Sequence, residues 1–149
     1  MRHVTRHTYW TLGLLALLAV VGDALGQGRS QTYGDFELHY NAIATVVLEP
    51  EIAQRYEIQR SQRRGLLTVS LQRDGEPVPA AVNARSQNLA GQTQAIRMRE
   101  IIEGDAVYYI GTFGATHEEE LEFKVTAQPK DQKAGPFELV FEHTFFGDQ

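Results

Sequence analysis

The chain has 149 residues, with 14 lysines and arginines against 19 aspartates and glutamates, and it contains no cysteine. The absence of cysteine excludes a disulfide framework, a thiol nucleophile and a lipoprotein anchor attached to a cysteine side chain. The acidic balance argues against nucleic-acid binding, because phosphate recognition needs a basic face.

The N-terminus, residues 1–26, is typical of a secretory signal peptide. Two arginines precede an apolar run from Leu12 to Val21, within the roughly 7–15 residues of such a region. Small residues then place the cleavage site after Gly26. A membrane anchor is the alternative, but a spanning helix needs about 20 apolar residues, and Asp23 interrupts this run early. We therefore expect export to the periplasm and a mature chain of residues 27–149.

The mature chain is predicted to be a single domain. Removal of two arginines and one aspartate with the signal leaves 12 basic and 18 acidic residues, a net charge of −6. A chain of this length buries roughly two thirds of its unfolded surface, which is enough for one core. No second long apolar stretch follows, so we expect no stable membrane insertion after cleavage.

The first half of the mature chain alternates apolar and polar residues. Residues 36–43 (FELHYNAI) and 66–72 (LLTVSLQ) have the period of two that is typical of half-buried strands. Between them, residues 48–58 (LEPEIAQRYEI) predict one short helix, with Pro50 at its first position. An Asp-Gly pair then predicts a turn, and residues 79–89 (PAAVNARSQNL) predict a weaker strand.

The second half continues the pattern. Residues 92–102 (QTQAIRMREII), 106–113, 119–127 and 136–146 each predict a strand. The triplet Glu103-Gly104-Asp105 separates the first two of these strands. A calcium loop needs about 6–8 oxygen ligands, whereas this triplet offers two carboxylates. We therefore predict that it is a hairpin turn and no metal site.

Together these segments predict an all-β fold. About seven short strands with turn residues between them indicate an antiparallel immunoglobulin-like β-sandwich with one short helix. A closed barrel is the alternative. Most aromatic side chains are expected to fill the core, while Tyr108, which alternates with Tyr109, is expected to face outward.

Several stretches carry a resemblance to a known family: YGDFELHYNAI, LEPEIAQRYEIQRSQRRGLLTVSL, LAGQTQAIRMREIIEGDAVYYIGTF and the aromatic end FELVFEHTFF. The chain resembles the small secreted gammaproteobacterial proteins classed as domain of unknown function 4426. The resemblance covers nearly all of the mature chain. It implies a periplasmic, mostly β domain, and it implies no catalytic residues.

The histidines and serines give no recognisable chemical motif. His39, His117 and His143 remain after cleavage, and imidazole with carboxylate could hold zinc or copper, but their spacing matches no tight ligand pattern. No serine lies in a known nucleophile motif, and Ser70 could meet a histidine only through tertiary structure. We therefore expect no catalytic residue, no cofactor and no metal site.

The most suggestive feature is a cluster of arginines in an acidic protein. Residues 55–65 (RYEIQRSQRRG) contain Arg55, Arg60, Arg63 and Arg64. Guanidinium groups bind phosphate and carboxylate through forked hydrogen bonds. We identify these four residues as candidate contacts for an anion or a partner. The alternative is a solvated loop that keeps the start of a strand soluble.

The sequence thus favours a non-enzymatic binding or accessory domain of the periplasm. It would act through a sheet edge or the arginine loop on an envelope protein or an anionic envelope component. A metal-handling protein or a hydrolase that uses the scattered histidines and glutamates is one alternative. A structural or stress-protective envelope protein is the other.

Overall fold

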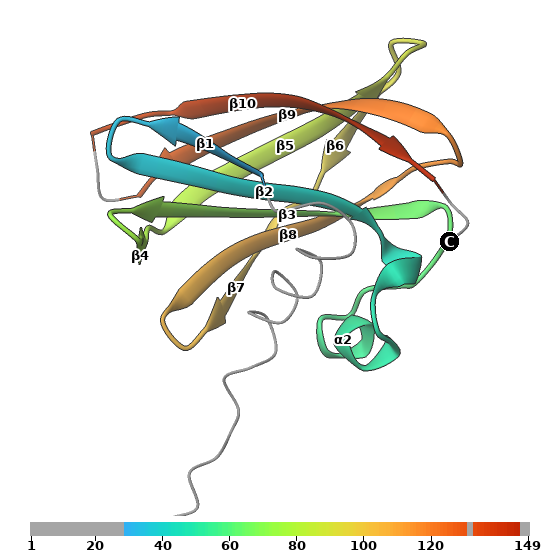
Figure 1. Cartoon of the computed structure of the whole chain (residues 1–149), viewed down its shortest axis with the longest axis horizontal. Helices are drawn as coiled ribbons and strands as arrows, with labels where there is room; N and C mark the ends of the chain where they lie inside the picture. The colour runs from blue at the N-terminus through green and yellow to red at the C-terminus, as the bar shows by residue number, and fades with distance from the viewer. Residues whose placement is uncertain (1–28, 131–132, 147–149) are drawn as a thin grey trace, which may run out of the picture.

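The computed structural model describes residues 29–130 and 133–146, which form two antiparallel sheets packed face to face (Figure 1). Sheet A contains, in spatial order, β1 (Arg29–Tyr33), β2 (Phe36–Ala44), β3 (Arg64–Arg73), β8 (Ala106–Gly114) and β7 (Arg99–Glu103), with β4 (Glu76–Pro77) beside β3. Sheet B contains β10 (Phe137–Phe145), β9 (Glu119–Pro129), β5 (Ala80–Asn88) and β6 (Thr93–Ile96). The predicted sandwich is confirmed, and the barrel alternative is wrong.

The predicted short helix is also present. A 3-10 turn, η1 (Thr45–Val47), precedes α2 (Pro50–Arg55), and Pro50 stands at the start of α2, where its missing N–H costs no hydrogen bond. In the described part of the chain, no helix has the length and apolarity needed to cross a membrane. The predicted signal peptide, residues 1–26, lies outside the described residues.

One predicted strand is divided between the two sheets. The stretch 92–102 is not continuous, because β6 belongs to sheet B and β7 belongs to sheet A. The chain passes from one sheet to the other against Gly111 of β8. A Cβ atom on Gly111 would lie 2.7 Å from Ile96 Cγ2 and 2.8 Å from the carbonyl oxygen of Arg97. The absent side chain of Gly111 therefore makes this close crossing possible.

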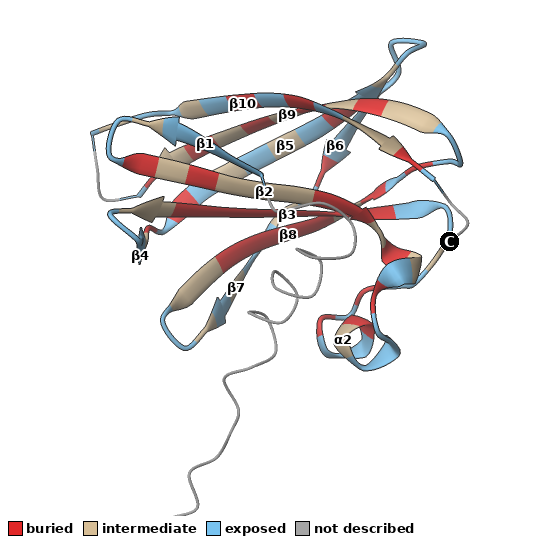
Figure 2. Ribbon diagram, in the orientation of Figure 1, coloured by how far each residue is buried: buried red, intermediate tan, exposed pale blue. Residues whose placement is uncertain are grey.

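The main core lies between the sheets, where the inward positions of the alternating strands meet (Figure 2). Its centre is aromatic. Phe123 stacks on Phe141, with ring centroids 4.9 Å apart, and meets the edge of Phe113 at 4.9 Å. Such ring pairs add about 0.5–1.5 kcal/mol each beyond their buried area. The aromatic C-terminal strand expected from the sequence, β10, therefore contributes Phe141 and Phe145 to the core.

A second, smaller cluster covers part of the outer face of sheet A. Here Leu48, Ala53, Tyr56 and Ile58 of α2 and its flanking turns pack on apolar residues of β2, β3 and β8, namely Ile43, Leu66, Tyr108 and Ile110. The expectation that Tyr108 faces solvent is therefore wrong, since the side chain is 7% exposed. It does point away from Tyr109, but the residues around α2 cover that face.

The triplet Glu103-Gly104-Asp105 forms the predicted hairpin turn. The ladder between β7 and β8 ends at the pair Glu103–Ala106, which leaves Gly104 and Asp105 as the two loop residues. Gly104 has φ of +58°. A positive φ at the first loop residue is required in a type II′ turn, and glycine adopts it without a steric penalty.

Gly104→Ala should lower the free energy of unfolding by about 1 kcal/mol, because an L-residue with a Cβ atom is sterically strained at positive φ. No atom lies within 4 Å of the added Cβ, so backbone strain is the whole effect. The variant Glu103→Gln with Asp105→Asn keeps the shape and acceptor oxygens of the turn and should cost well under about 1 kcal/mol. Urea unfolding midpoints measure both. A larger loss in the double amide variant would show that the carboxylates, and not the backbone, hold this turn.

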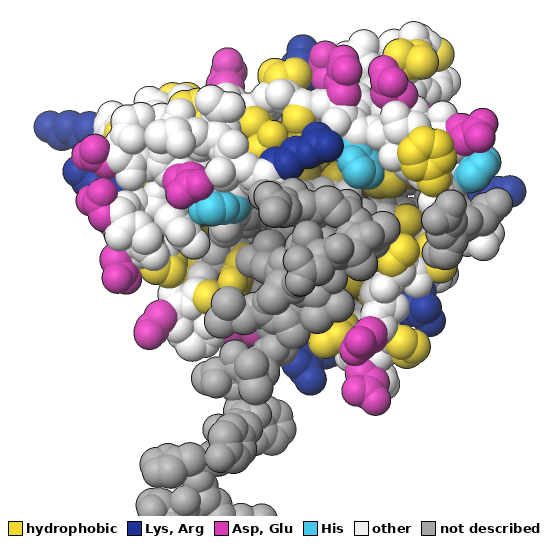
Figure 3. Space-filling model, in the orientation of Figure 1, with side chains coloured by type: hydrophobic (Ala, Val, Ile, Leu, Met, Phe, Trp, Pro, Cys, Tyr) yellow, Lys and Arg dark blue, Asp and Glu magenta, His cyan; other side chains and the backbone are white. Residues whose placement is uncertain are grey.

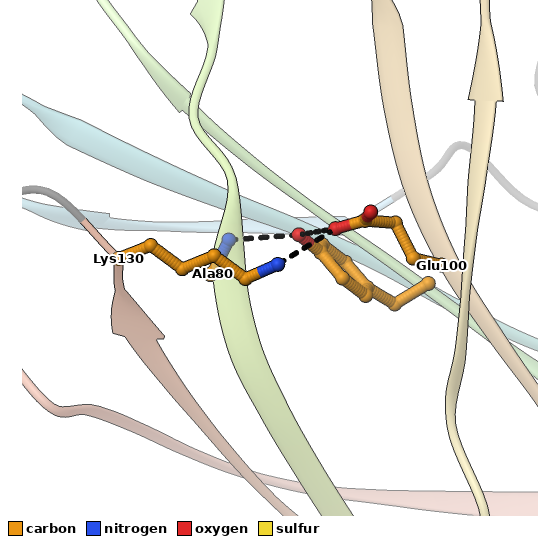
Figure 4. Close-up of polar contacts among 4 residues, drawn as sticks. Ala80, Glu100 and Lys130 are labelled. Carbon is orange, nitrogen blue, oxygen red and sulfur yellow. Dashed lines mark hydrogen bonds and ion pairs between the residues drawn. The ribbon is translucent and has the colours of Figure 1, made fainter.

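A group of polar contacts, which we call the polar clasp, joins the two sheets through Tyr109 of β8, Ala80, Glu100 and Lys130 (Figure 4). The hydroxyl of Tyr109 accepts a hydrogen bond of 2.7 Å from the backbone N–H of Ala80 in β5. It donates one of 3.0 Å to Glu100 Oε2 in β7, and Lys130 Nζ lies 3.2 Å from the same oxygen. The bond from Tyr109 and then the contact with Lys130 lower the pKa of Glu100. The clasp therefore fixes β7 to β8 and both of them to sheet B.

Candidate anion-binding site

The loop that carries the arginines is held by a buried threonine. Thr45 Oγ1 accepts a hydrogen bond of 2.9 Å from the backbone N–H of Ser61 and donates one of 3.1 Å to the Ser61 carbonyl. Thr45 has no exposed surface. Ser61 Oγ in turn accepts a bond of 3.1 Å from the N–H of Arg63. These bonds fix the backbone just before β3 and so fix the origin of the next two arginine side chains.

The four arginines predicted as one group divide into two pairs. Arg60 donates a hydrogen bond of 2.9 Å to the carbonyl of Val46, and Arg55 acts on the neighbouring Tyr56 hydroxyl, whose pKa it lowers. These two side chains therefore secure the segment around α2. Arg63 and Arg64 are exposed at the start of β3 and line a surface hollow of about 430 Å³.

This hollow is polar, and none of the described residues that line it is acidic. Its other lining residues are Gln59, Ser61, Gln94, Thr112, Phe113 and Gly114. Gln94 Oε1 accepts a hydrogen bond of 2.9 Å from the N–H of Gly114. Hydroxyl, amide and guanidinium groups in one hollow can donate several hydrogen bonds to an oxyanion.

A second hollow, of about 330 Å³, adjoins the first. Its lining includes Arg97 and Arg99, and Thr112 lines both hollows. We call the two hollows together the basic groove, defined by Arg63, Arg64, Arg97, Arg99 and Thr112. Two segments more than thirty positions apart in the sequence thus supply its four cations, two of which were not among the predicted contacts.

Among the residues that the structure describes, no carboxylate forms an ion pair with the four arginines of the basic groove. The ion pairs in the described part of the chain involve other residues. Glu57 is the acidic residue lining the second hollow. On the face drawn in Figure 3, acidic side chains are scattered around the periphery and form no single patch. The groove is therefore a local concentration of positive charge on an acidic protein.

The sequence contained a pattern that could have identified Arg97 and Arg99, the two arginines that were not predicted as contacts. Arg97 and Arg99 occupy the polar positions of the predicted strand 92–102. The sequence did not show that Arg97 and Arg99 lie near Arg63 and Arg64, because that proximity depends on the crossing of the chain against Gly111. Only after β6 and β7 separate into different sheets do Arg97 and Arg99 line a hollow that adjoins the one beside the start of β3.

Tyr56 ties α2 to the tip of the β7–β8 hairpin next to the groove. Its hydroxyl donates a hydrogen bond to the carboxylate of Glu103. Burial, with the bond and the charge of Glu103, raises the pKa of Tyr56 to about 12, while Arg55 acts in the opposite direction. Glu103 therefore has a structural partner in addition to its place beside the turn.

The three histidines lie apart from one another. His39 Nε2 lies 3.5 Å from Glu37, and His117 Nε2 lies 3.6 Å from Glu118. His143 meets the edge of the Phe145 ring, and burial lowers its pKa, with a smaller effect of the same sign from Arg29. Within residues 29–130 and 133–146, no three histidine, aspartate or glutamate side chains come together as a set of metal ligands.

One serine does lie beside a histidine. His39 of β2 is directly opposite Ser70 of β3 in the ladder. No hydrogen bond joins the two side chains in the described structure. A serine nucleophile is activated by a hydrogen bond to its base, and the described structure shows none between Ser70 and His39.

Comparison with known proteins identifies the family. The sequence matches the family described as "Domain of unknown function (DUF4426)" over residues 30–148. The chain belongs to the DUF4426 family. A crystal structure of a DUF4426 family protein from Pseudomonas aeruginosa PAO1 is similar, with a TM-score of 0.72 and 28% sequence identity. The similarity covers 82% of this chain and 97% of that one. The resemblance found in the sequence is confirmed.

The fold of this DUF4426 member extends to other proteins. FetP of uropathogenic Escherichia coli strain F11, expressed recombinantly in the periplasm, has a TM-score of 0.58 at 16% identity, covering 82% of this chain and 95% of FetP. A copper-bound FetP variant has a TM-score of 0.55 at 15% identity, covering 79% and 94%. At these identities the likeness shows a shared fold alone. No curated protein matches the sequence.

Proposed function

We propose that this DUF4426 protein is a non-enzymatic binding domain of the periplasm that holds an anionic ligand in the basic groove. The observation that carries the proposal is that Arg63 and Arg64 line one hollow and Arg97 and Arg99 line the adjoining one along β8, with no ion pair to a carboxylate among the described residues. Four guanidinium groups with adjacent hydroxyl and amide donors match the oxygens of carboxylate or phosphate groups. The ligand is an envelope protein or another anionic envelope component.

The periplasmic location rests on the N-terminal sequence pattern, with its arginines, apolar run and small residues before position 27. FetP, which has the same fold, was expressed in the periplasm. A fold without disulfides is also compatible with this compartment, because the aromatic core supplies the stability. Mass spectrometry of the protein from a periplasmic fraction tests the location, and a product that begins at Met1 would contradict it.

The metal-handling alternative has less support. The copper in the FetP variant belongs to a protein that is 15% identical, and its ligands cannot be transferred at that distance. The described residues of this chain separate His39, His117 and His143 onto β2, a loop and β10. We therefore make anion binding the proposed function.

The double variant Arg63→Gln with Arg64→Gln should weaken binding of a small polyanion by about tenfold or more, since charged hydrogen bonds contribute roughly 1.5–3 kcal/mol each. Tripolyphosphate and citrate are the probes, titrated calorimetrically into the purified protein at low ionic strength. Binding should weaken as salt is added, because exposed charges are screened over about 10 Å at 0.1 M.

A matched control removes two cations elsewhere. Arg85 and Lys124 line a different hollow, on the outer face of sheet B, together with Glu138. Arg85→Gln with Lys124→Gln changes the net charge by the same amount and should leave the affinity within about twofold of the original. Equal losses in the two double variants would show a non-specific charge effect and contradict a site in the basic groove.

A further inference from the structure

Strand β8 has an open backbone edge in the middle of the basic groove. On one side β8 pairs with β3 as far as Gly114, whereas on the other side its ladder with β7 ends at Ile110. Residues 111–114 therefore have a strand neighbour on one side only. This segment includes Thr112, the residue that lines both hollows of the groove.

Two hydrogen bonds establish which backbone groups face this edge. The N–H of Ala115 donates to the carbonyl of Arg63, toward β3, and the N–H of Gly114 donates to Gln94 Oε1, away from β3. Backbone groups alternate in direction along an antiparallel strand. The N–H and C=O of Thr112 therefore point away from β3, as those of Gly114 do.

In the described part of the chain, no hydrogen bond is made to the backbone N–H or C=O of Thr112. The chain that leaves β6 passes against the inner side of Gly111 and joins β8 only from Arg99 onward. Gln94 covers the next edge position with its side chain. The half-buried Thr112 is thus left with one donor and one acceptor free, between the two pairs of arginines.

We infer that the ligand of the basic groove is an extended acidic peptide segment, which pairs with the edge of β8 at Thr112 while its carboxylates bind the arginines. The inference rests on the proposed function and narrows its ligand to one class. Addition of a strand at an exposed sheet edge is an established mode of peptide recognition. Alternate side chains of an extended peptide lie about 6.5–7 Å apart on one face, so several carboxylates can face the groove together.

The free carbonyl distinguishes a peptide from a fully ionised inorganic oxyanion. The oxygens of such an anion can accept from the N–H of Thr112 and from the arginines, but they supply no donor to the C=O. A peptide backbone supplies both a donor and an acceptor. The hollows also expose little apolar surface for acyl chains, because Phe113 in the first and Ile58, Leu66 and Ile110 in the second are all buried residues.

The test uses protein purified from cells that express the full chain. The probe is a capped pentapeptide of alternating glutamate and valine, with two methylated versions: one at both valine nitrogens and one at all three glutamate nitrogens. Methylation blocks backbone pairing on one side of an extended peptide without changing its charge. Affinities are measured by calorimetry at low salt, and amide shifts of Thr112 are followed by NMR.

We expect one methylated peptide to bind about tenfold more weakly than the parent and the other to bind within about twofold, because two backbone hydrogen bonds are lost on one side only. The parent peptide should also shift the Thr112 amide resonance. Equal affinities for the two methylated peptides would overturn the inference. Binding of tripolyphosphate or phosphatidylglycerol vesicles without peptide binding would overturn it and leave the proposed function standing. If none of these probes binds, both the peptide inference and the proposed anion-binding function are wrong.

Discussion

Gly65→Ala should lower the free energy of unfolding by about 3 kcal/mol, near the upper end of the cost of overpacking a core. Gly65 is opposite Phe113 in the ladder between β3 and β8, and the Phe113 ring lies directly over it. A Cβ atom at Gly65 would lie 2.2 Å from Cζ of that ring. This contact is far inside van der Waals distance, so the ring or the strand must move.

The Phe113 ring has little freedom to move. It is 3% exposed and packs edge-on against Phe123 and Phe145, with centroid distances of 4.9 and 5.3 Å. Interiors packed at crystal-like density transmit such displacements to their neighbours. The expected loss is a large part of the roughly 5–15 kcal/mol of stability that a domain of this size has.

The matched control is Gly114→Ala, one rung farther along the same ladder. The nearest atoms to a Cβ at Gly114 belong to the Gln94 amide, at 3.7 Å, so the change should stay within about 0.5 kcal/mol. Adding Phe113→Leu to Gly65→Ala should cost less than the sum of the single variants, because the smaller side chain relieves the clash. Urea unfolding measures all four proteins. Strict additivity would contradict the proposed contact between Gly65 and the ring.

Tyr109→Phe should lower the free energy of unfolding by about 1–3 kcal/mol, the cost of a buried backbone group without a partner. The hydroxyl of Tyr109 accepts from the N–H of Ala80, which is 2% exposed, and donates to Glu100 (Figure 4). Phenylalanine keeps the ring in the core but leaves that N–H unsatisfied. The bond between the sheets is lost with it.

Tyr108→Phe is the control, because Tyr108 is the neighbouring buried tyrosine on β8 and its hydroxyl makes no hydrogen bond in the described structure. It should change stability by less than about 0.5 kcal/mol.

Loss of the Tyr109 hydroxyl should also raise the pKa of Glu100, since that bond is the main cause of its lowered value. A carboxyl with a lowered pKa stabilises the fold above its unfolded pKa and loses that contribution as pH falls. The difference between Tyr109→Phe and the original protein should therefore narrow in acid, and a difference that widens would contradict the clasp.

The sequence by itself determined those features that depend on local chemistry. Alternation in 36–43 and 66–72 identified the strands, because a period of two is a property of the extended backbone. The expectation that 66–72 is half-buried was wrong, since Thr68 and Ser70 on its polar side are also buried. Pro50 marked the start of α2, and Gly104 marked a hairpin turn, since each residue restricts or permits particular φ values. The family followed from the same stretches.

Other features were decided by contacts between distant segments. The five residues of β1 are mostly exposed and lack an apolar alternation, so only pairing with β2 makes them a strand. A period of two also does not say which sheet a strand joins, which is why the break in 92–102 was missed. Likewise, alternation placed Tyr108 opposite Tyr109 but did not predict that α2 covers that face.

The basic groove shows the same division. Arg63 and Arg64 were recognisable as a local concentration of charge, whereas their meeting with Arg97 and Arg99 depends on the missing side chain of Gly111 and on the change of sheet beside it. The open edge at Thr112 follows from where the ladder with β7 ends. Charge and backbone preference are properties of a residue and its neighbours in sequence, but a site built across two sheets exists only once non-local packing has brought its parts together.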